Sequence, residues 1–222
     1  MPRLRDLSRN ESDHPVIKAV YDRFFGTRDP AEEPGVLPER GGTPGTYWTV
    51  TALSPEILEW VEHGLGIFLA ANESYEKGPS VRIDPQLKEL AICRAGWARG
   101  SQFVFSQHSK GLRMTGIDEE KVKAVPYWQT ADCYTPLERA VLAYTDGLVL
   151  GGGRIPDEHF EALKAHLPDE EILELTYVAA LWEMFATICK ALQVEFDDRP
   201  DPIVEVPLPG GDSVFNLGSD PS

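Results

Sequence analysis

The sequence predicts an all-α protein, and three observations support this class. Apolar residues recur at three- and four-residue spacing along most of the chain. Residue pairs that favour helix starts, such as Ser-Pro, Asp-Pro and Thr-Pro, precede several of these stretches. No stretch shows the sustained apolar alternation that is typical of a strand. With 222 residues, the chain is long enough to bury a sizeable core in one domain.

The first half of the chain predicts four helices, at residues 14–26, 54–74, 84–100 and 101–116. The first ends on a glycine, which favours termination. Ser54-Pro55 opens the second, because serine caps a helix and proline suits its first turn. Asp84-Pro85 opens the third, which should break between 96 and 100. Ser101 then caps the fourth.

The second half predicts three helices. The pattern "TPLE" at 135–138 is a capping box with a proline inside it, and the three glycines at 151–153 end the helix that it starts. A short helix follows from Pro156. A long one runs from residue 168 or 169 to about 194, in a stretch rich in apolar residues.

The pattern of composition predicts one domain with irregular ends. Residues 1–13 form an N-terminal arm, and residues 14–198 form a single helical domain. Within it, residues 27–46 are rich in Pro, Gly and Glu and predict a surface loop. Residues 199–222 carry no helical pattern and predict an extended tail.

The charge of the chain excludes several classes of partner. A formal net charge of −15 argues against nucleic acid, which is bound through clustered Lys and Arg. The N-terminus is charged where a secretory signal is apolar, and no apolar run approaches the length needed to span a bilayer. Cys93, Cys133 and Cys189 are scattered, as expected of reduced thiols. We therefore expect a cytoplasmic protein that binds a small-molecule substrate, without nucleic acid or membrane.

The candidate for chemistry is the stretch "GSQFVFSQH" at 100–108, which ends on His108. Helical spacing places His108 on one face with Val104, Phe105 and Leu112. Glu89 lies on the preceding helix, nineteen residues earlier. His108 alone is more typical of a structural histidine at a core edge, and Glu89 alone of a solvated helix residue, so the interpretation depends on both together.

This order of features resembles the carboxymuconolactone decarboxylase and alkyl hydroperoxidase D superfamily, whose motif is a Glu followed by Cys-x-x-Cys-x-x-x-His. Glu89 and His108 fall on the acid and the imidazole, and "GLRMTGID" is similar to the family's continuation. The resemblance covers roughly residues 14–198. It implies an all-α bundle of the alkyl hydroperoxidase D-like type that associates as a trimer or hexamer.

The chain departs from the family at the redox cysteines, which fall on Ser101 and Val104. Neither can form a thiolate or a disulfide. The resemblance therefore implies the cofactor-independent branch, with no metal and no cofactor. It favours a decarboxylase-like lyase that moves protons on a small organic acid or an aromatic-derived metabolite. We expect His108 to be the general acid or base and Glu89 to orient it or to shuttle the proton.

Further residues are candidates for substrate binding. Ser101 starts a helix, where free amides favour an anion, although a plain N-cap explains it equally well. Arg94 could pair with a substrate carboxylate or with an internal one such as Glu174. Gln107 could supply a hydrogen bond, or it is an exposed helix residue.

Three more candidates carry a stronger structural alternative. Trp97 and Phe105 could line the pocket, although aromatic residues at helical spacing usually belong to the core. Glu183 is a charge inside "VAALWEMFATICKAL". It could mark a solvent edge, a subunit seam or a second acid of the pocket.

Two other classes of function stay open. One is a peroxidase of the alkyl hydroperoxidase D type, which would have to use Cys93 because the paired cysteines are absent. The other is an oligomeric scaffold without catalysis, which a cleft filled by Trp97 or Phe103 would favour.

Overall fold

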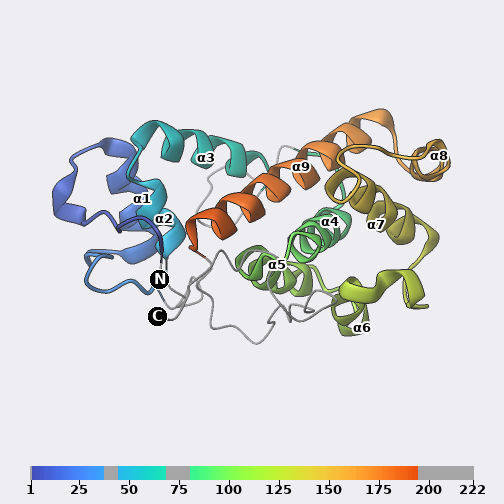
Figure 1. Ribbon diagram of the computed structural model, residues 1–222, viewed down its shortest axis with the longest axis horizontal. Coiled ribbons are helices and arrows are strands. Elements are labelled where there is room, and N and C mark those ends of the chain that lie inside the picture. Colours follow the sequence, from blue (N-terminus) through green and yellow to red (C-terminus); the bar gives the residue numbers. More distant parts are fainter. Residues whose placement is uncertain (1, 38–44, 69–80, 195–222) are drawn as a thin grey trace, which may run out of the picture.

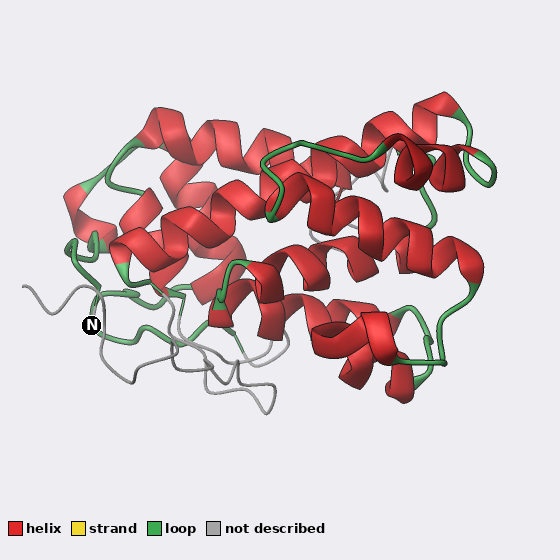
Figure 2. Ribbon diagram, turned by 45° about the vertical axis from the view of Figure 1, so that its right-hand side comes forward, coloured by secondary structure: helices red, strands yellow, loops and turns green. Residues whose placement is uncertain are grey.

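The computed structural model describes residues 2–37, 45–68 and 81–194, and these residues contain helices but no strand (Figure 2). The all-α prediction is confirmed. The predicted tail at 199–222 lies outside the described residues. The α-helices are α1 (Pro15–Phe25), α2 (Thr46–Thr51), α3 (Pro55–Phe68), α4 (Pro85–Ala98), α5 (Gln102–Met114), α6 (Glu119–Ala124), α7 (Pro136–Val149), α8 (Asp157–Lys164) and α9 (Asp169–Leu192).

Local capping explains why most of these helices begin where the sequence predicts. The Asp84 side chain accepts hydrogen bonds from the backbone N–H groups of residues 86 and 87 at the start of α4. Thr135 and Glu138 form a complete capping box at the start of α7. Gly26 ends α1 with φ of 64°, a conformation that favours glycine.

The sequence pattern does not predict some of the short helices. The predicted surface loop at 27–46 leads directly into α2, a six-residue helix. Tyr47 and Val50 of α2 are buried, so packing rather than helix propensity stabilises it. The short helix α6 and the 3-10 helix η3 (Val125–Thr130) were also not predicted.

Helix α4 lies at the centre of the molecule and packs against α5, α7 and α9 (Figure 1). Every residue from Leu87 to Gly96 is buried. This helix is therefore covered on all sides over these residues, and its charged residues Lys88, Glu89 and Arg94 are covered as well.

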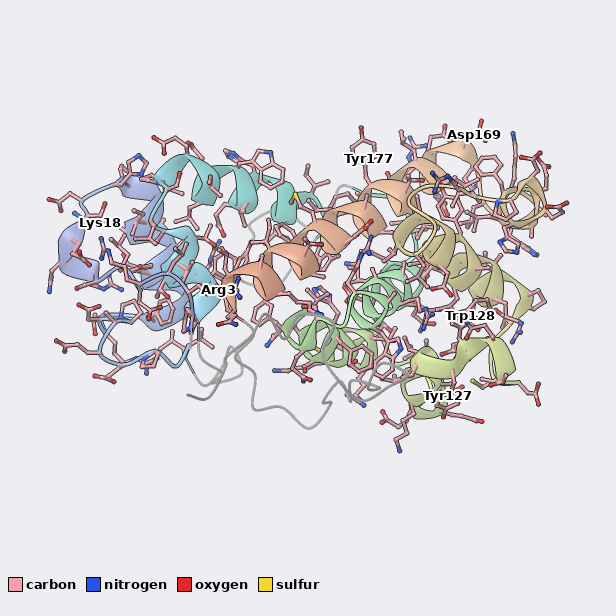
Figure 3. All side chains as sticks on the ribbon, in the orientation of Figure 1. Arg3, Lys18, Tyr127, Trp128, Asp169 and Tyr177 are labelled. Carbon is pink, nitrogen blue, oxygen red and sulfur yellow. The ribbon has the colours of Figure 1, made fainter. Side chains whose placement is uncertain are left out.

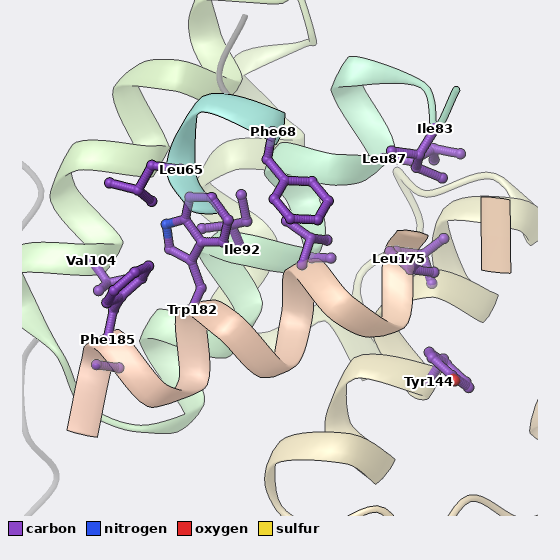
Figure 4. Close-up of a cluster of buried hydrophobic side chains, with 14 of the residues drawn as sticks. Leu65, Phe68, Ile83, Leu87, Ile92, Val104, Tyr144, Leu175, Trp182 and Phe185 are labelled. Atoms are coloured by element: carbon purple, nitrogen blue, oxygen red, sulfur yellow. The ribbon is translucent and has the colours of Figure 1, made fainter. Parts of the chain in front are cut away.

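Two hydrophobic clusters lie on either side of α4. The central cluster joins α3, α4, α7 and α9, and Figure 4 shows part of it, including Leu65, Phe68, Ile92, Leu175 and Trp182. The second cluster joins α4 and α5 to α6 and η3 and includes Leu90, Cys93, Phe105, Leu112 and Trp128. A third cluster holds α1 against the start of α3.

Helix α9 crosses the molecule and is long and apolar enough, by length and composition alone, to span a bilayer. The expectation that no apolar run has this length was therefore wrong. The core helix of a soluble protein passes the same test, and the buried residues of α9 pack in the central cluster. Its last turn is held by the N-terminal arm: the Arg3 backbone N–H donates to the Leu192 carbonyl at 2.8 Å, and its guanidinium donates to the Ala191 carbonyl at 3.1 Å.

Candidate functional site

The structure brings Glu89 of α4 and His108 of α5 into direct contact. The Nδ1 atom of His108 lies 2.8 Å from the Oε2 atom of Glu89, a hydrogen-bond distance. The side chains are 10% and 15% exposed, respectively. A carboxylate and an imidazole are thus held together in a largely apolar setting, where their interaction is stronger than it would be in water.

Two glycines make this close approach possible. A Cβ atom on Gly96 would lie 2.8 Å from Val104 Cγ1 and 2.9 Å from the Phe105 backbone nitrogen, so Gly96 lets α5 approach α4. A Cβ atom on Gly111 would lie 2.8 Å from Glu89 Oε2. The absence of a side chain at Gly111 therefore leaves room for the Glu89 carboxylate.

The other nitrogen of His108 is engaged by Trp182 of α9. The indole Nε1–H donates a hydrogen bond to His108 Nε2, and the two rings meet edge to face with centroids 5.1 Å apart. An indole N–H can only donate, so Nε2 is unprotonated in this state. The ring proton is therefore on Nδ1, where it is donated to Glu89. With these two partners, the favoured tautomer of the neutral ring carries its proton on Nδ1.

Lys88 completes the cluster and was not predicted from the sequence. Its ammonium group lies 3.1 Å from Glu89 Oε1 and donates to the Phe68 carbonyl of α3 at 2.6 Å. The Lys88 side chain is only 5% exposed. The signal that could have revealed it is a lysine inside "LKELAICRAG", a helix whose neighbouring positions are almost all apolar.

The environment of Glu89 favours its charged form. Burial raises the pKa of Glu89, but the adjacent His108 and Lys88 side chains lower it more, so the pKa lies below its ordinary value. Glu89 is therefore a carboxylate at neutral pH. Its Oε2 atom can accept a hydrogen bond from His108, and its Oε1 atom can pair with the Lys88 ammonium.

The other predicted residues lie in several different places. Ser101 is fully buried and caps α5, with its hydroxyl accepting from the Val104 N–H at 3.4 Å. Val104 is buried in the central cluster. Trp97 and Phe105 pack on each other in the second cluster, with ring centroids 5.4 Å apart. Gln107 follows on α5 and is partly exposed.

Arg94 has an internal partner, but a different one from the Glu174 suggested above. Its guanidinium binds both carboxylate oxygens of Asp146 on α7, at 2.5 and 3.0 Å. Asp146 also accepts from the Trp128 indole at 2.9 Å. Glu174 instead accepts from the backbone N–H groups of residues 82 and 83. Helical spacing could not reveal Asp146, because it lies 52 positions away.

Glu183 follows Trp182 on α9 and forms an ion pair with Arg99 at the end of α4. It thus links α9 to the C-terminal end of α4. The described residues contain no group of three His, Cys, Asp or Glu side chains that could hold a metal ion. The ring that contacts His108 is Trp182, whereas Phe103 stacks on Tyr47.

The fold and the Glu–His pair define a class. Residues 68–147, which include Glu89 and His108, match the carboxymuconolactone decarboxylase family. This segment of the chain is therefore similar to the carboxymuconolactone decarboxylase family, and it lacks the Cys-x-x-Cys pair.

Particular relatives extend this likeness. The uncharacterized protein YdfG of Bacillus subtilis (strain 168) is 27% identical over 107 residues, which is 48% of this chain and 71% of that protein. A protein of unknown function from Agrobacterium tumefaciens, described as a putative antioxidant defence protein AhpD, has a TM-score of 0.58 at 24% identity and covers 67% of this chain and 96% of its own.

The fold also matches the apo form of the debrominase Bmp8. The TM-score is 0.62 at 20% identity, over 87% of this chain and 91% of that one. A variant of the same debrominase was solved in complex with 2,3,4-tribromopyrrole. At these identities, the structural likeness shows the shared fold.

Proposed function

We propose that this protein is a proton-transfer enzyme of the decarboxylase-like kind, with His108 as the general acid/base and Glu89 as its partner. The family supports decarboxylase- or peroxidase-like chemistry. The observation that carries the choice between them is the 2.8 Å contact between Glu89 and His108 beside Ser101 and Val104, two residues that cannot act as thiols.

The chemistry follows from the tautomer. When the imidazole carries its proton on Nδ1 and donates it in a hydrogen bond to the Glu89 carboxylate, Nε2 has a basic lone pair. When a substrate group replaces the Trp182 indole, Nε2 can accept a proton, and Glu89 stabilises the imidazolium that forms. In a decarboxylation, the carbon that loses CO2 takes up one proton, which this imidazolium donates from Nε2.

The substrate class is proposed as a small organic acid or an aromatic-derived metabolite. Trp182 contacts His108 and belongs to the same apolar cluster as Phe68 and Leu65, an environment that would suit a planar or aliphatic substrate body. The match to a debrominase that binds a brominated pyrrole supports the aromatic part of this class. Because the paired thiols are absent, a reaction that does not depend on thiols is more consistent with this chain.

A peroxidase that uses Cys93 has less support. Cys93 is fully buried in the second cluster, on the other side of α4 from Trp182. A peroxide would have to open that cluster to reach the sulfur.

The test is a screen of small organic acids for CO2 release, followed by comparison of His108→Ala and Glu89→Gln. Each variant should lose roughly 10²-fold or more in kcat, because general acid–base catalysis contributes about that much. Lys110→Ala, an exposed change on the same helix, is the control. Turnover that survives in both site variants would refute the assignment.

A further inference from the structure

The strongest unexplained feature of the site is a buried lysine. Lys88 is 5% exposed, and its neighbours on α4 are buried as well. Removing an ammonium group from water is costly unless its protons are satisfied by acceptors. Here two acceptors are present: Glu89 Oε1 at 3.1 Å and the Phe68 carbonyl at 2.6 Å.

We infer that Lys88 is a positioning residue of the Glu89–His108 pair: its ammonium group fixes the second carboxylate oxygen of Glu89 and ties it to the last turn of α3. This inference rests on the proposed function of that pair. Lys88 contacts neither nitrogen of the imidazole and acts through Glu89.

The geometry gives Lys88 two effects. First, each Glu89 oxygen has one partner, Lys88 on Oε1 and His108 on Oε2, so the carboxylate cannot rotate without breaking a bond. Second, the positive and negative charges of Lys88 and Glu89 cancel. Glu89 therefore stays charged while the imidazole is neutral, and when the imidazole gains a proton Glu89 favours the imidazolium whereas Lys88 opposes it.

The Phe68 carbonyl of α3 fixes the position of the Lys88 ammonium. The Phe68 carbonyl belongs to the last described residue of α3 and accepts from the Lys88 ammonium at 2.6 Å. Phe68 also packs edge to face on Trp182, with centroids 6.0 Å apart. Phe68 thus supports the site in two ways: its carbonyl holds Lys88, the partner of Glu89, and its ring packs on Trp182.

The other charged groups on the surrounding helices have partners elsewhere. Glu62 of α3 pairs with Arg23 of α1, and Glu183 of α9 pairs with Arg99. Arg94, on α4 itself, pairs with Asp146 of α7. Among the lysine and arginine side chains of the described residues, Lys88 is therefore the one that forms an ion pair with Glu89, in addition to the His108 contact.

The experiment follows the Glu89 side-chain carboxyl by 13C NMR through a pH titration. Lys88→Gln keeps a donor for the Phe68 carbonyl but removes the charge, so the pKa of Glu89 should rise from its lowered value. Lys88→Arg keeps the charge and should restore a low pKa. Arg94→Gln removes a buried cation from the same helix, at the Asp146 pair, and should leave the titration of Glu89 unchanged.

Activity gives a second measurement. In Lys88→Gln, the acid limb of the kcat profile should move to higher pH with the titration of Glu89, whereas the same limb in Arg94→Gln should stay in place. An unchanged Glu89 titration in Lys88→Gln, or an equal shift in Arg94→Gln, would overturn the inference. Either result would leave the His108→Ala and Glu89→Gln tests of the function intact.

The unaltered protein provides a test that does not depend on folding of a variant. If Lys88 holds Glu89, the side-chain ammonium of Lys88 should be observable by 15N NMR at neutral pH, with protons that exchange slowly with water. A neutral amine, or exchange as fast as that of an exposed lysine, would also overturn the inference.

Discussion

At the scale of single residues, the site has a donor and an acceptor fixed on opposite sides of one imidazole. Glu89 accepts from Nδ1 and Trp182 donates to Nε2, so the ring has one preferred protonation state and one preferred orientation. If His108 were an imidazolium, its Nε2–H would point at the indole N–H of Trp182, and two donors would face each other. Protonation of His108 and displacement of the Trp182 indole are thus linked events.

The lowered pKa of Glu89 predicts how stability depends on pH. A carboxyl whose pKa is lower in the folded state stabilises the fold fully above its unfolded pKa of about 4.3, and this contribution is lost as the pH falls through the folded pKa. We expect the free-energy difference between the protein and Glu89→Gln to shrink below about pH 4.3. Urea unfolding between neutral and acidic pH measures it.

The control for this experiment is Glu119→Gln. Glu119 pairs with Arg113 at the surface, where both side chains are substantially exposed, so this change should affect stability little at any pH. A stability difference for Glu89→Gln that stays constant down to pH 3 would contradict the charged, stabilising state of Glu89.

Trp182→Phe should free the second imidazole nitrogen. The ring volume is largely kept while the indole donor is lost, so a destabilisation of about 1–2 kcal/mol is expected. Diethyl pyrocarbonate, which acylates an unprotonated imidazole nitrogen, should modify His108 faster in this variant. Mass spectrometry of the digested protein reports the rate at each histidine.

Phe185→Leu separates the donor from the packing. Phe185 lies against Trp182 in the central cluster, with centroids 5.9 Å apart, and its truncation leaves the indole donor in place. If this change accelerates modification of His108 as much as Trp182→Phe does, loosened packing rather than the lost hydrogen bond explains the reactivity.

At the scale of helices, the α4–α5 pair depends on missing side chains. Gly111→Ala would ordinarily stabilise a helix by up to about 1 kcal/mol. Here the new methyl group would lie 2.8 Å from Glu89 Oε2, so we expect a loss of stability and of the Glu89–His108 contact. Thermal unfolding, together with the activity of the variant, checks this expectation.

Gly64→Ala is the matched substitution in α3. A Cβ atom there meets nothing within 4 Å among the described residues, so the helix should gain stability. If Gly111→Ala stabilises the protein as Gly64→Ala does, the carboxylate is not confined by α5 in the way described.

The sequence predicts long helices well and their lateral contacts poorly, for a physical reason. Helix starts depend on capping by neighbours in the chain, as Asp84 shows, and the Glu89–His108 pair could be expected from a family motif. Lys88 and Trp182 were not expected, because their partners come from α3 and α5, far away in the chain. Likewise, α2 depends on tertiary packing, which local patterns do not contain.

At the scale of the whole molecule, apolar side chains remain exposed on two helices. Ile57, Trp60 and Ile67 share a face of α3, and Leu173 and Tyr177 lie on α9, where Tyr177 points outward (Figure 3). Exposed apolar surface of this kind is typical of an interaction site. We therefore expect a homo-oligomer, the trimer or hexamer that the family resemblance implies.

Light scattering at micromolar concentration should give a mass that is a multiple of 24.7 kDa. Trp60→Glu places a charge in the middle of the apolar face of α3 and should reduce this mass, whereas Glu59→Gln, beside it, should not. A mass of one chain for the unaltered protein would contradict the expected association.

The N-terminal arm has a topological consequence. Its bonds from Arg3 to the carbonyls of Ala191 and Leu192 join residues 188 and 189 positions apart, so the start of the described chain lies against the end of α9. Residue 3 and the end of α9 can therefore be joined by a short linker and the chain opened elsewhere, since every contact between the described helices is kept. The exposed glycines at 152 and 153, between α7 and α8, are a natural place for new ends, and a circular permutant opened there should keep the contacts of His108 with Glu89 and Trp182.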